Sequence, residues 1–190
     1  IATSVPPGAI TGFITVNIGC ASGVSPGIYT VDSCVPASEK NALQQLYNST
    51  DGANWTNNAN WLTTDVSSWY GVIVAGCHVT EIQLGDNGLT GELPYDLVDL
   101  NALEVFDVNK NNLVGYVPDS FLFMPNLNTL NLSNNNFVVL PNLTTGSLNT
   151  SVLDLDVSNN ALDFGDLEPN MAFTNFNYVP QAEIPPPQLV

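Results

Sequence analysis

VTEIQLGDNGL (residues 79–89) has a pattern that recurs three times along the chain, in LEVFDVNKNNL (103–113), LNTLNLSNNNF (127–137) and VLDLDVSNNAL (152–162). The starts of the four copies are 24, 24 and 25 residues apart. Each copy reads LxxLxLxxNxL, with aliphatic or aromatic side chains at the L positions. Self-similarity at a fixed period of this length indicates a solenoid, in which stacked copies bury one continuous core.

We number the positions of each copy from its first residue. A short parallel strand should run through positions 3 to 6. Side chains at positions 4 and 6 then point into the core and those at 3 and 5 point outward, because strand side chains alternate. The asparagine at position 9 lies where the chain turns, and its amide can bond the backbone of neighbouring turns as a ladder. The ladder residues are Asn87, Asn111, Asn135 and Asn160.

Segments around the repeats carry a resemblance to a known family. The tails LTGELP (89–94) and LVGYVP (113–118) resemble the L-x-G-x-[IL]-P signature of plant-type leucine-rich repeats. ALQQLYNSTDGANWTNNANWL (42–62) resembles the N-terminal cap of extracellular leucine-rich-repeat proteins of plants, algae and bacteria. DLEPN (166–170) and NYVPQ (177–181) resemble the end of secreted repeat proteins from Bacteroidetes-like bacteria. The resemblance implies an α/β leucine-rich-repeat solenoid on a secreted or cell-surface protein.

These features divide the chain into four parts. Residues 1–34 are a β-rich extension, 35–78 the N-terminal cap, 79–165 the repeats, and 166–190 a C-terminal cap with a proline-rich tail. Within the cap, apolar residues at helical spacing predict a helix over 37–48. The three tryptophans of the cap are expected to seal the open end of the core.

The extension contains two stretches that read as strands, 10–18 and 27–33, rich in β-branched residues. A strand beyond the cap could pair with the sheet edge of another subunit, and head-to-tail contacts that do not close give filaments. The alternative is that residues 1–34 fold back on their own cap or belong to a preceding domain. The chain begins at Ile1, so we expect a processed segment of an exported protein.

The charge balance excludes several classes of partner. Two lysines and no arginine stand against 18 acidic residues, which gives a net charge of −16 with histidine neutral. Binding to nucleic acid requires lysine and arginine to neutralise phosphates, and anionic membranes make the same demand. No apolar run approaches the roughly 18 residues of a membrane-spanning helix. Proteins, glycans, cations and further copies of the chain remain as partners.

The three cysteines are Cys20, Cys34 and Cys77, so one intrachain disulfide leaves one thiol over. An exported protein favours a disulfide, but the spacing alone leaves the pairing open. The family resemblance implies Cys34 with Cys77, because such caps tie the helix to the region before the first repeat.

The sequence gives little support for a catalytic site. His78 beside Cys77 has no second histidine and fits no zinc pattern, so a role in the cap is preferred. Asp154 and Asp156 lie two apart on one strand, a spacing that a glycosidase pair could use, but an open face offers neither carboxyl the burial that raises a pKa. Calcium could use Asp107 with these two, helped by an asparagine. We expect no enzyme, resident metal or cofactor.

Two functions remain. The first is a structural surface protein that assembles with itself through the N-terminal strand and the solenoid ends. The second is a binding module that recognises a protein or glycan on the concave face, with or without the help of calcium. The residues expected to form that face are Glu81, Gln83, Asp107, Asn109, Asn131, Ser133, Asp154 and Asp156. Five glycosylation sequons are expected to lie on the surface: Asn48, Asn54, Asn131, Asn142 and Asn149.

Overall fold

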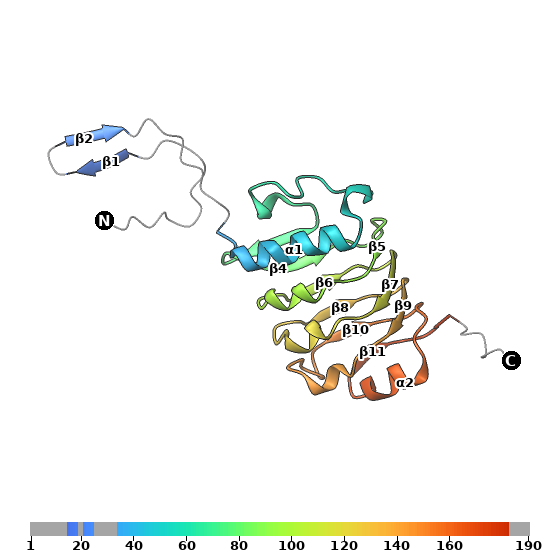
Figure 1. Cartoon of the computed structure of the whole chain (residues 1–190). Helices are drawn as coiled ribbons and strands as arrows, with labels where there is room; N and C mark the ends of the chain where they lie inside the picture. Colours follow the sequence, from blue (N-terminus) through green and yellow to red (C-terminus); the bar gives the residue numbers. More distant parts are fainter. Residues whose placement is uncertain (1–14, 19–20, 25–33, 183–190) are drawn as a thin grey trace.

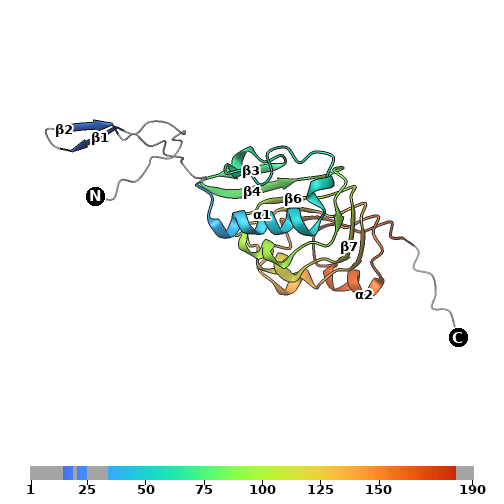
Figure 2. The same ribbon diagram turned by 45° about the horizontal axis from the view of Figure 1, so that its top comes forward.

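The computed structural model describes residues 15–18, 21–24 and 34–182 (Figure 1). The repeats stack as successive turns of one solenoid, with the first helix at one end and the last at the other (Figures 1 and 2). Two sheets run through the stack, and within each the strands of the repeats are parallel; short helical segments join the sheets in each turn. The predicted leucine-rich-repeat solenoid is therefore confirmed.

The main sheet has the order β11-β10-β8-β6-β4-β3. The four repeats supply β4 (His78–Gln83), β6 (Val105–Asp107), β8 (Thr129–Asn131) and β10 (Asp154–Asp156), all parallel. The repeat pattern missed the two outer strands. β3 (Val72–Ala75) pairs antiparallel with β4, and β11 (Asn175–Asn177) adds a further parallel strand beside β10.

A smaller sheet follows the repeat tails. It contains β5 (Thr90–Gly91), β7 (Asn112–Tyr116) and β9 (Asn136–Val139). Gly91 has φ +89°, and a Cβ there would lie 2.3 Å from the Ser49 carbonyl oxygen at the end of the first helix, so this turn requires glycine. The third tail lacks the glycine and still forms β9, with a register shift against β7.

The fourth tail ends the smaller sheet, because it forms a helix. α2 (Phe164–Leu167) begins with a capping box, in which Asp163 accepts the Asp166 N–H and Asp166 accepts the Asp163 N–H. The remaining helical turns are 3₁₀ segments: η1 (Gly52–Asn54), η2 (Val66–Ser68), η3 (Tyr95–Asp99), η4 (Asp119–Phe123), η5 (Leu143–Thr145) and η6 (Glu168–Asn170).

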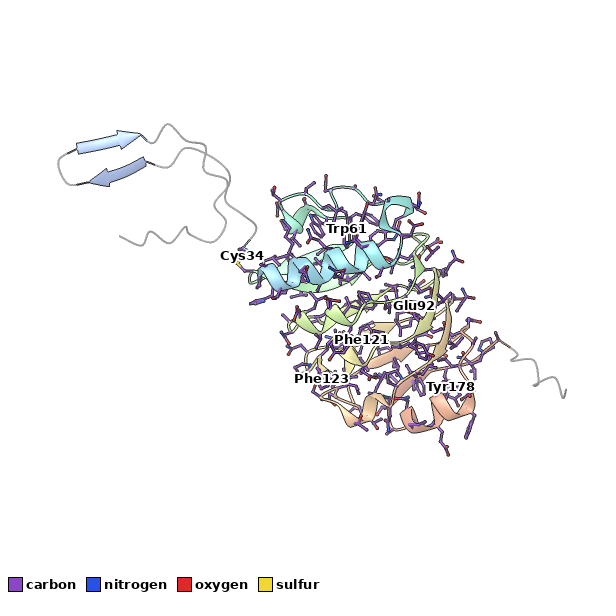
Figure 3. All side chains as sticks on the ribbon, viewed as in Figure 1. Cys34, Trp61, Glu92, Phe121, Phe123 and Tyr178 are labelled. Carbon is purple, nitrogen blue, oxygen red and sulfur yellow. A yellow bond between two sulfur atoms is a disulfide. The ribbon has the colours of Figure 1, made fainter. Side chains whose placement is uncertain are left out.

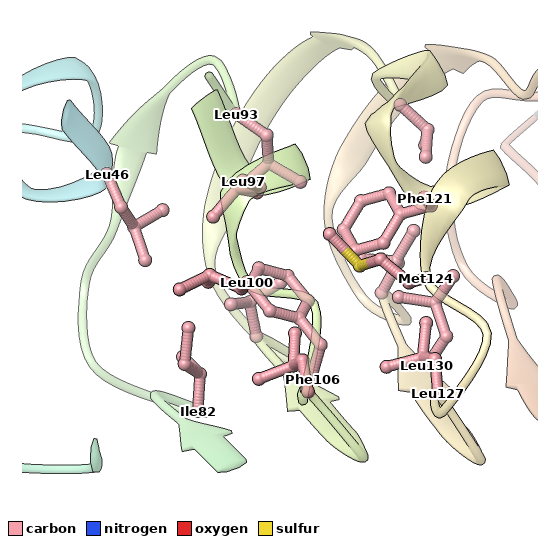
Figure 4. Packing of buried hydrophobic residues seen from close by; sticks show 14 of the residues in the cluster. Leu46, Ile82, Leu93, Leu97, Leu100, Phe106, Phe121, Met124, Leu127 and Leu130 are labelled. Atoms are coloured by element: carbon pink, nitrogen blue, oxygen red, sulfur yellow. The ribbon is translucent and has the colours of Figure 1, made fainter. Parts of the chain in front are cut away.

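The core is continuous from the cap to the last repeat, with η3 and η4 supplying side chains opposite the main sheet (Figure 4). Positions 4 and 6 are buried in all four repeats, as predicted. Position 1 of the fourth repeat is a correction: Val152 is 54% exposed, and Leu153 fills its place at 0%. The extra residue of this repeat lies in a turn where Val152 and Leu153 both donate to the Asn149 carbonyl, at 3.1 and 2.9 Å.

The predicted ladder of asparagine side chains is confirmed. Asn135 is buried, its Oδ1 accepts the Leu113 N–H at 3.0 Å, and its Nδ2 donates to the carbonyls of Val108 and Leu132 at 2.9 and 3.1 Å. Each such amide therefore bonds backbone groups of its own turn and of the preceding one. At the C-terminal end Gln181 takes over this task, since its Oε1 accepts the Leu162 N–H and its Nε2 donates to the Val157 carbonyl.

The N-terminal cap closes the other end. α1 (Ala37–Ser49) confirms the predicted helix. The three tryptophans are buried and contact one another, with centroids 4.9 Å apart for Trp55 and Trp61 and 4.8 Å for Trp61 and Trp69. Figure 3 shows Trp61 at this end of the stack, and the disulfide at Cys34 beside the start of α1. The bond joins Cys34 to Cys77, the pairing that the family resemblance implied.

In the extension, β1 (Thr15–Ile18) and β2 (Ala21–Val24) form an antiparallel hairpin. β1 lies within the first predicted strand. The second, over 27–33, falls outside the described residues, as do Cys20 and the proline-rich tail. The four domain boundaries stay predictions.

Position 8 is left-handed in every repeat. The φ angles there are 52° at Asp86, 53° at Lys110, 56° at Asn134 and 54° at Asn159. Aspartate and asparagine tolerate this conformation better than other side chains with a Cβ. Lysine is the exception, and it is exposed. The bend of the second repeat is therefore more strained than the other three bends, where aspartate or asparagine occupies position 8.

Replacing Asn135 by alanine should lower the free energy of unfolding by about 2–4 kcal/mol, because buried backbone groups lose their partners. Urea unfolding followed by circular dichroism measures the change. Asn136→Ala is the matched control: its side chain is exposed, so a change within about 0.5 kcal/mol is expected. Equal losses in the two variants would contradict the ladder.

Replacing Lys110 by asparagine should raise the free energy of unfolding by about 0.5–1 kcal/mol, since asparagine adopts the left-handed backbone more readily. Lys110→Ala removes the same charge without this advantage, so it should give no gain. Thermal unfolding of the three proteins separates conformation from charge, and a gain in the alanine variant alone would refute the explanation.

Candidate functional site

The main sheet turns one face toward the core and leaves the other open. Strand registers align the position 3 side chains across it, and we call this line the outer row. Its members come from all six strands: Ile73, Glu81, Val105, Thr129, Asp154 and Asn175. Neighbouring members are about 4.8 Å apart, the spacing of paired strands. Every one of them is exposed or partly exposed.

Position 5 forms a second line, the inner row, which lies nearer the bends of the chain. Its members are Gln83, Asp107, Asn131, Asp156 and Asn177. Here the side chains have a structural task. The Oδ1 of Asp156 accepts the backbone N–H and the hydroxyl of Ser158, at 2.9 and 2.7 Å. This bond from a side chain to the backbone two residues on is an Asx turn, which ends the strand.

The same turn recurs in the two preceding repeats. Asp107 Oδ1 accepts the Asn109 backbone N–H at 2.9 Å and the Asn109 amide at 2.6 Å. Asn131 Oδ1 accepts the Ser133 N–H at 3.2 Å and its hydroxyl at 2.8 Å. Three of the five inner-row side chains are therefore committed to shaping the bend before any ligand arrives.

This division bears on the predicted binding face, whose role in binding stays a prediction. Ser133 is 5% exposed and Asn109 is half-buried, so both support the Asx turns from behind instead of facing a partner. The other six predicted residues do reach the open face: Glu81, Gln83, Asp107, Asn131, Asp154 and Asp156. The sequence analysis missed Ile73 and Asn175, because their strands lie outside the repeat pattern. It also missed Val105 and Thr129, although both occupy position 3 of their repeats, where side chains are expected to point outward.

Acidic groups on this face have no cationic partner among residues 34–182. The one ion pair in that part joins His78 to Glu39, with Nδ1 and Oε1 2.5 Å apart. Glu81 accepts only the Gln83 amide, at 2.5 Å, and the Asp154 carboxylate has no hydrogen-bond partner among the described residues. The open face therefore presents unneutralised negative charge.

The structure gives two of the catalytic candidates, His78 and Asp156, structural roles. Glu39 is buried in α1, and besides His78 it accepts the Val79 N–H at 2.8 Å, which ties the helix to β4. Of the pair on β10, Asp156 is engaged by Ser158, and its Oδ2 also accepts the Asn177 amide at 3.0 Å. Residues 34–182 contain no group of three or more His, Cys, Asp and Glu side chains able to hold a metal ion.

Four of the five sequon asparagines are exposed, on the cap or on the helical side of the repeats: Asn48, Asn54, Asn142 and Asn149. Asn131 is the exception, because it lies in the inner row. A glycan on its Nδ2 would project over the open face. Glycosylation at any of the five stays a prediction.

Comparison with known proteins agrees with the stacked repeats. The sequence profile described as leucine rich repeat matches residues 77–137. Residues 77–137 are therefore leucine-rich repeats, by sequence as well as by fold. Two Arabidopsis thaliana relatives are the receptor-like kinase TMK2, 32% identical over 64% of this chain, and the protein STRUBBELIG-RECEPTOR FAMILY 5, 43% identical over 33%.

Solved structures resemble this leucine-rich-repeat chain over a longer span. The BIR2 ectodomain of Arabidopsis thaliana is 25% identical over 66% of this chain and 81% of its own, with a TM-score of 0.54. The receptor kinase HAESA, solved with the peptide hormone IDA and the co-receptor SERK1, is 26% identical over 67% of this chain and 22% of its own, with a TM-score of 0.56.

The relatives place the leucine-rich-repeat chain outside the cell or on its surface. It spans only 14% of TMK2 and 9% of the STRUBBELIG relative, so nothing of their kinase activity is carried over. No helix among the described residues is long and apolar enough to cross a membrane.

Replacing Asp107 by alanine should cost about 1 kcal/mol of unfolding free energy, because the Asn109 N–H loses its acceptor. Asp107→Asn should stay within about 0.5 kcal/mol of the original, since asparagine forms the same turn one repeat later, at Asn131. Differential scanning fluorimetry distinguishes them. A loss in the asparagine variant equal to that in alanine would show that charge, not the Asx turn, matters.

Proposed function

We propose that this chain is the recognition part of an extracellular protein and binds an extended segment of a partner protein across the outer row. The observation that carries the proposal is the division between the two rows. Three of the five inner-row side chains are held by bonds to their own bends. The outer-row side chains point away from the core, and none of them bonds a bend; Glu81 accepts only the Gln83 amide, and the Thr129 hydroxyl donates only to Asn128. Because the bends beneath the outer row are already rigid, this surface loses little entropy when a ligand binds.

The relatives support the same proposal of peptide binding. The leucine-rich-repeat ectodomain of HAESA, 26% identical to this chain, has been solved with a peptide hormone. The outer row spans six strands, and the five steps of about 4.8 Å between them make about 24 Å, which matches about seven residues of extended peptide. The row is therefore long enough for a short linear segment and too small for most of a folded protein.

The other expected function, assembly into a surface fibre, has no support from the described residues or the relatives. β1 is paired with β2, so one of its edges is already occupied. A glycan ligand and calcium assistance likewise have no support from the described residues or the relatives.

A random-peptide phage library selected on this chain tests the proposal. The bait should come from a bacterial host that forms disulfides, so that no glycan covers Asn131. We expect enriched peptides to bind the original chain and to lose at least tenfold in affinity for Thr129→Trp, which fills the middle of the outer row.

Asp119→Trp is the matched control, because Asp119 is exposed at the start of η4, on the helical side of the solenoid. Peptides should bind this variant as they bind the original chain. Failure to enrich any peptide, or enriched peptides that bind both tryptophan variants equally, would overturn the proposed function.

A further inference from the structure

The outer row has a charge pattern that specifies what the bound segment must contain. We infer that its ligand is an extended peptide with cationic side chains at positions i and i+4 and a small or apolar side chain at i+2. The inference rests on the proposed function and deepens it, since it names the chemistry of the partner.

The spacing of the two outer-row carboxylates is the first argument. Glu81 lies on β4 and Asp154 on β10, and the registers place three strand steps between them. Three steps of about 4.8 Å separate the two positions by about 14 Å. Residues i and i+4 of an extended peptide share one face and lie about 13–14 Å apart. One peptide strand laid along the outer row therefore reaches both carboxylates.

The residues between the carboxylates provide the second argument. Val105 and Thr129 occupy the two intervening strands, and both are partly exposed. Residue i+2 of the peptide would lie about 7 Å from residue i, between these two side chains. A methyl-bearing pair favours a small or apolar side chain there, because apolar groups gain free energy when they leave water together.

Charge complementarity is the third argument. The Asp154 carboxylate has no partner among the described residues, and one oxygen of Glu81 is free of the Gln83 amide. Both lysines of the chain lie elsewhere: the Lys40 ammonium donates to the Thr64 carbonyl in the cap, and Lys110 occupies a bend. A net charge of −16 adds long-range attraction for a cationic ligand.

A single metal ion cannot take the place of this peptide. Calcium holds its oxygen ligands at about 2.3–2.6 Å, whereas the two strand positions that carry these carboxylates are about 14 Å apart. The spacing therefore requires two separate cationic groups joined by a linker of the right length, which an extended peptide supplies.

The test is an NMR titration of the unglycosylated, disulfide-bonded chain with two synthetic peptides of identical composition. The first has lysines at i and i+4, leucine at i+2 and serine elsewhere; the second has the lysines adjacent. We expect the first to shift amide resonances of β4, β6, β8 and β10 and to bind about threefold more tightly than the second, as one exposed ion pair contributes.

Two isosteric variants assign the contacts. Glu81→Gln and Asp154→Asn should each weaken the first peptide about threefold, and together about tenfold, because sites this far apart act independently. Asp119→Asn removes an equal charge on the helical side and should leave the affinity unchanged. All three variants keep side-chain volume at exposed or partly exposed positions, so folding should persist, and the dispersion of the spectrum verifies it.

Equal affinities for the two peptides, or an equal loss in Asp119→Asn, would overturn the inference. Its failure can be told from failure of the proposed function by the library selection. If that selection enriches peptides that lose binding to Thr129→Trp but lack the i, i+4 cation pair, the binding function stands and the proposed chemistry of its ligand is wrong.

Discussion

The asparagine at each bend is the constraint on which this solenoid depends. A turn of the chain leaves backbone amides and carbonyls facing the core, where water cannot reach them, and unpaired groups there are costly. The Asn111 side chain accepts the backbone N–H groups of Asn87 and Leu89, and donates to the carbonyls of Leu84 and Val108. One side chain thus joins two successive turns. Because the apolar core can stack only when the bends are satisfied, the ladder sets the register of every strand.

The ladder continues into both caps, which explains how so short a stack ends. At the N-terminal end Asn87 bonds the backbone of Asn57, with its Oδ1 2.7 Å from the amide nitrogen and its Nδ2 3.0 Å from the carbonyl oxygen. At the other end Gln181 substitutes for an asparagine. The caps therefore satisfy the terminal bends as well as covering the apolar ends. The open face is the consequence: with the bends fixed, the outer row is held in a regular line by strands that need none of its side chains.

The sequence predicted the parts of this structure that repeat. Four copies of one pattern located the strands, the inward positions and the ladder, and helical spacing located α1. Prediction stopped where the pattern stops. β3 and β11 lie outside it. The residue added before β10 puts Leu153 in the core, where the pattern predicted Val152. For the open face, the sequence singled out polar residues, yet it could not tell Asp154, which is free, from Asp107, which forms an Asx turn. That difference depends on a side chain two residues further on.

The central claim is that the inner row shapes the bends and the outer row binds the ligand. Alanine substitutions along both rows, each assayed for its unfolding midpoint and for affinity toward one peptide selected on the chain, test it most directly. The account predicts that inner-row changes at Asp107, Asn131 and Asp156 lower the midpoint more than they lower affinity. Outer-row changes at Glu81, Thr129 and Asp154 should do the reverse. Stability and affinity falling together in both rows would contradict it.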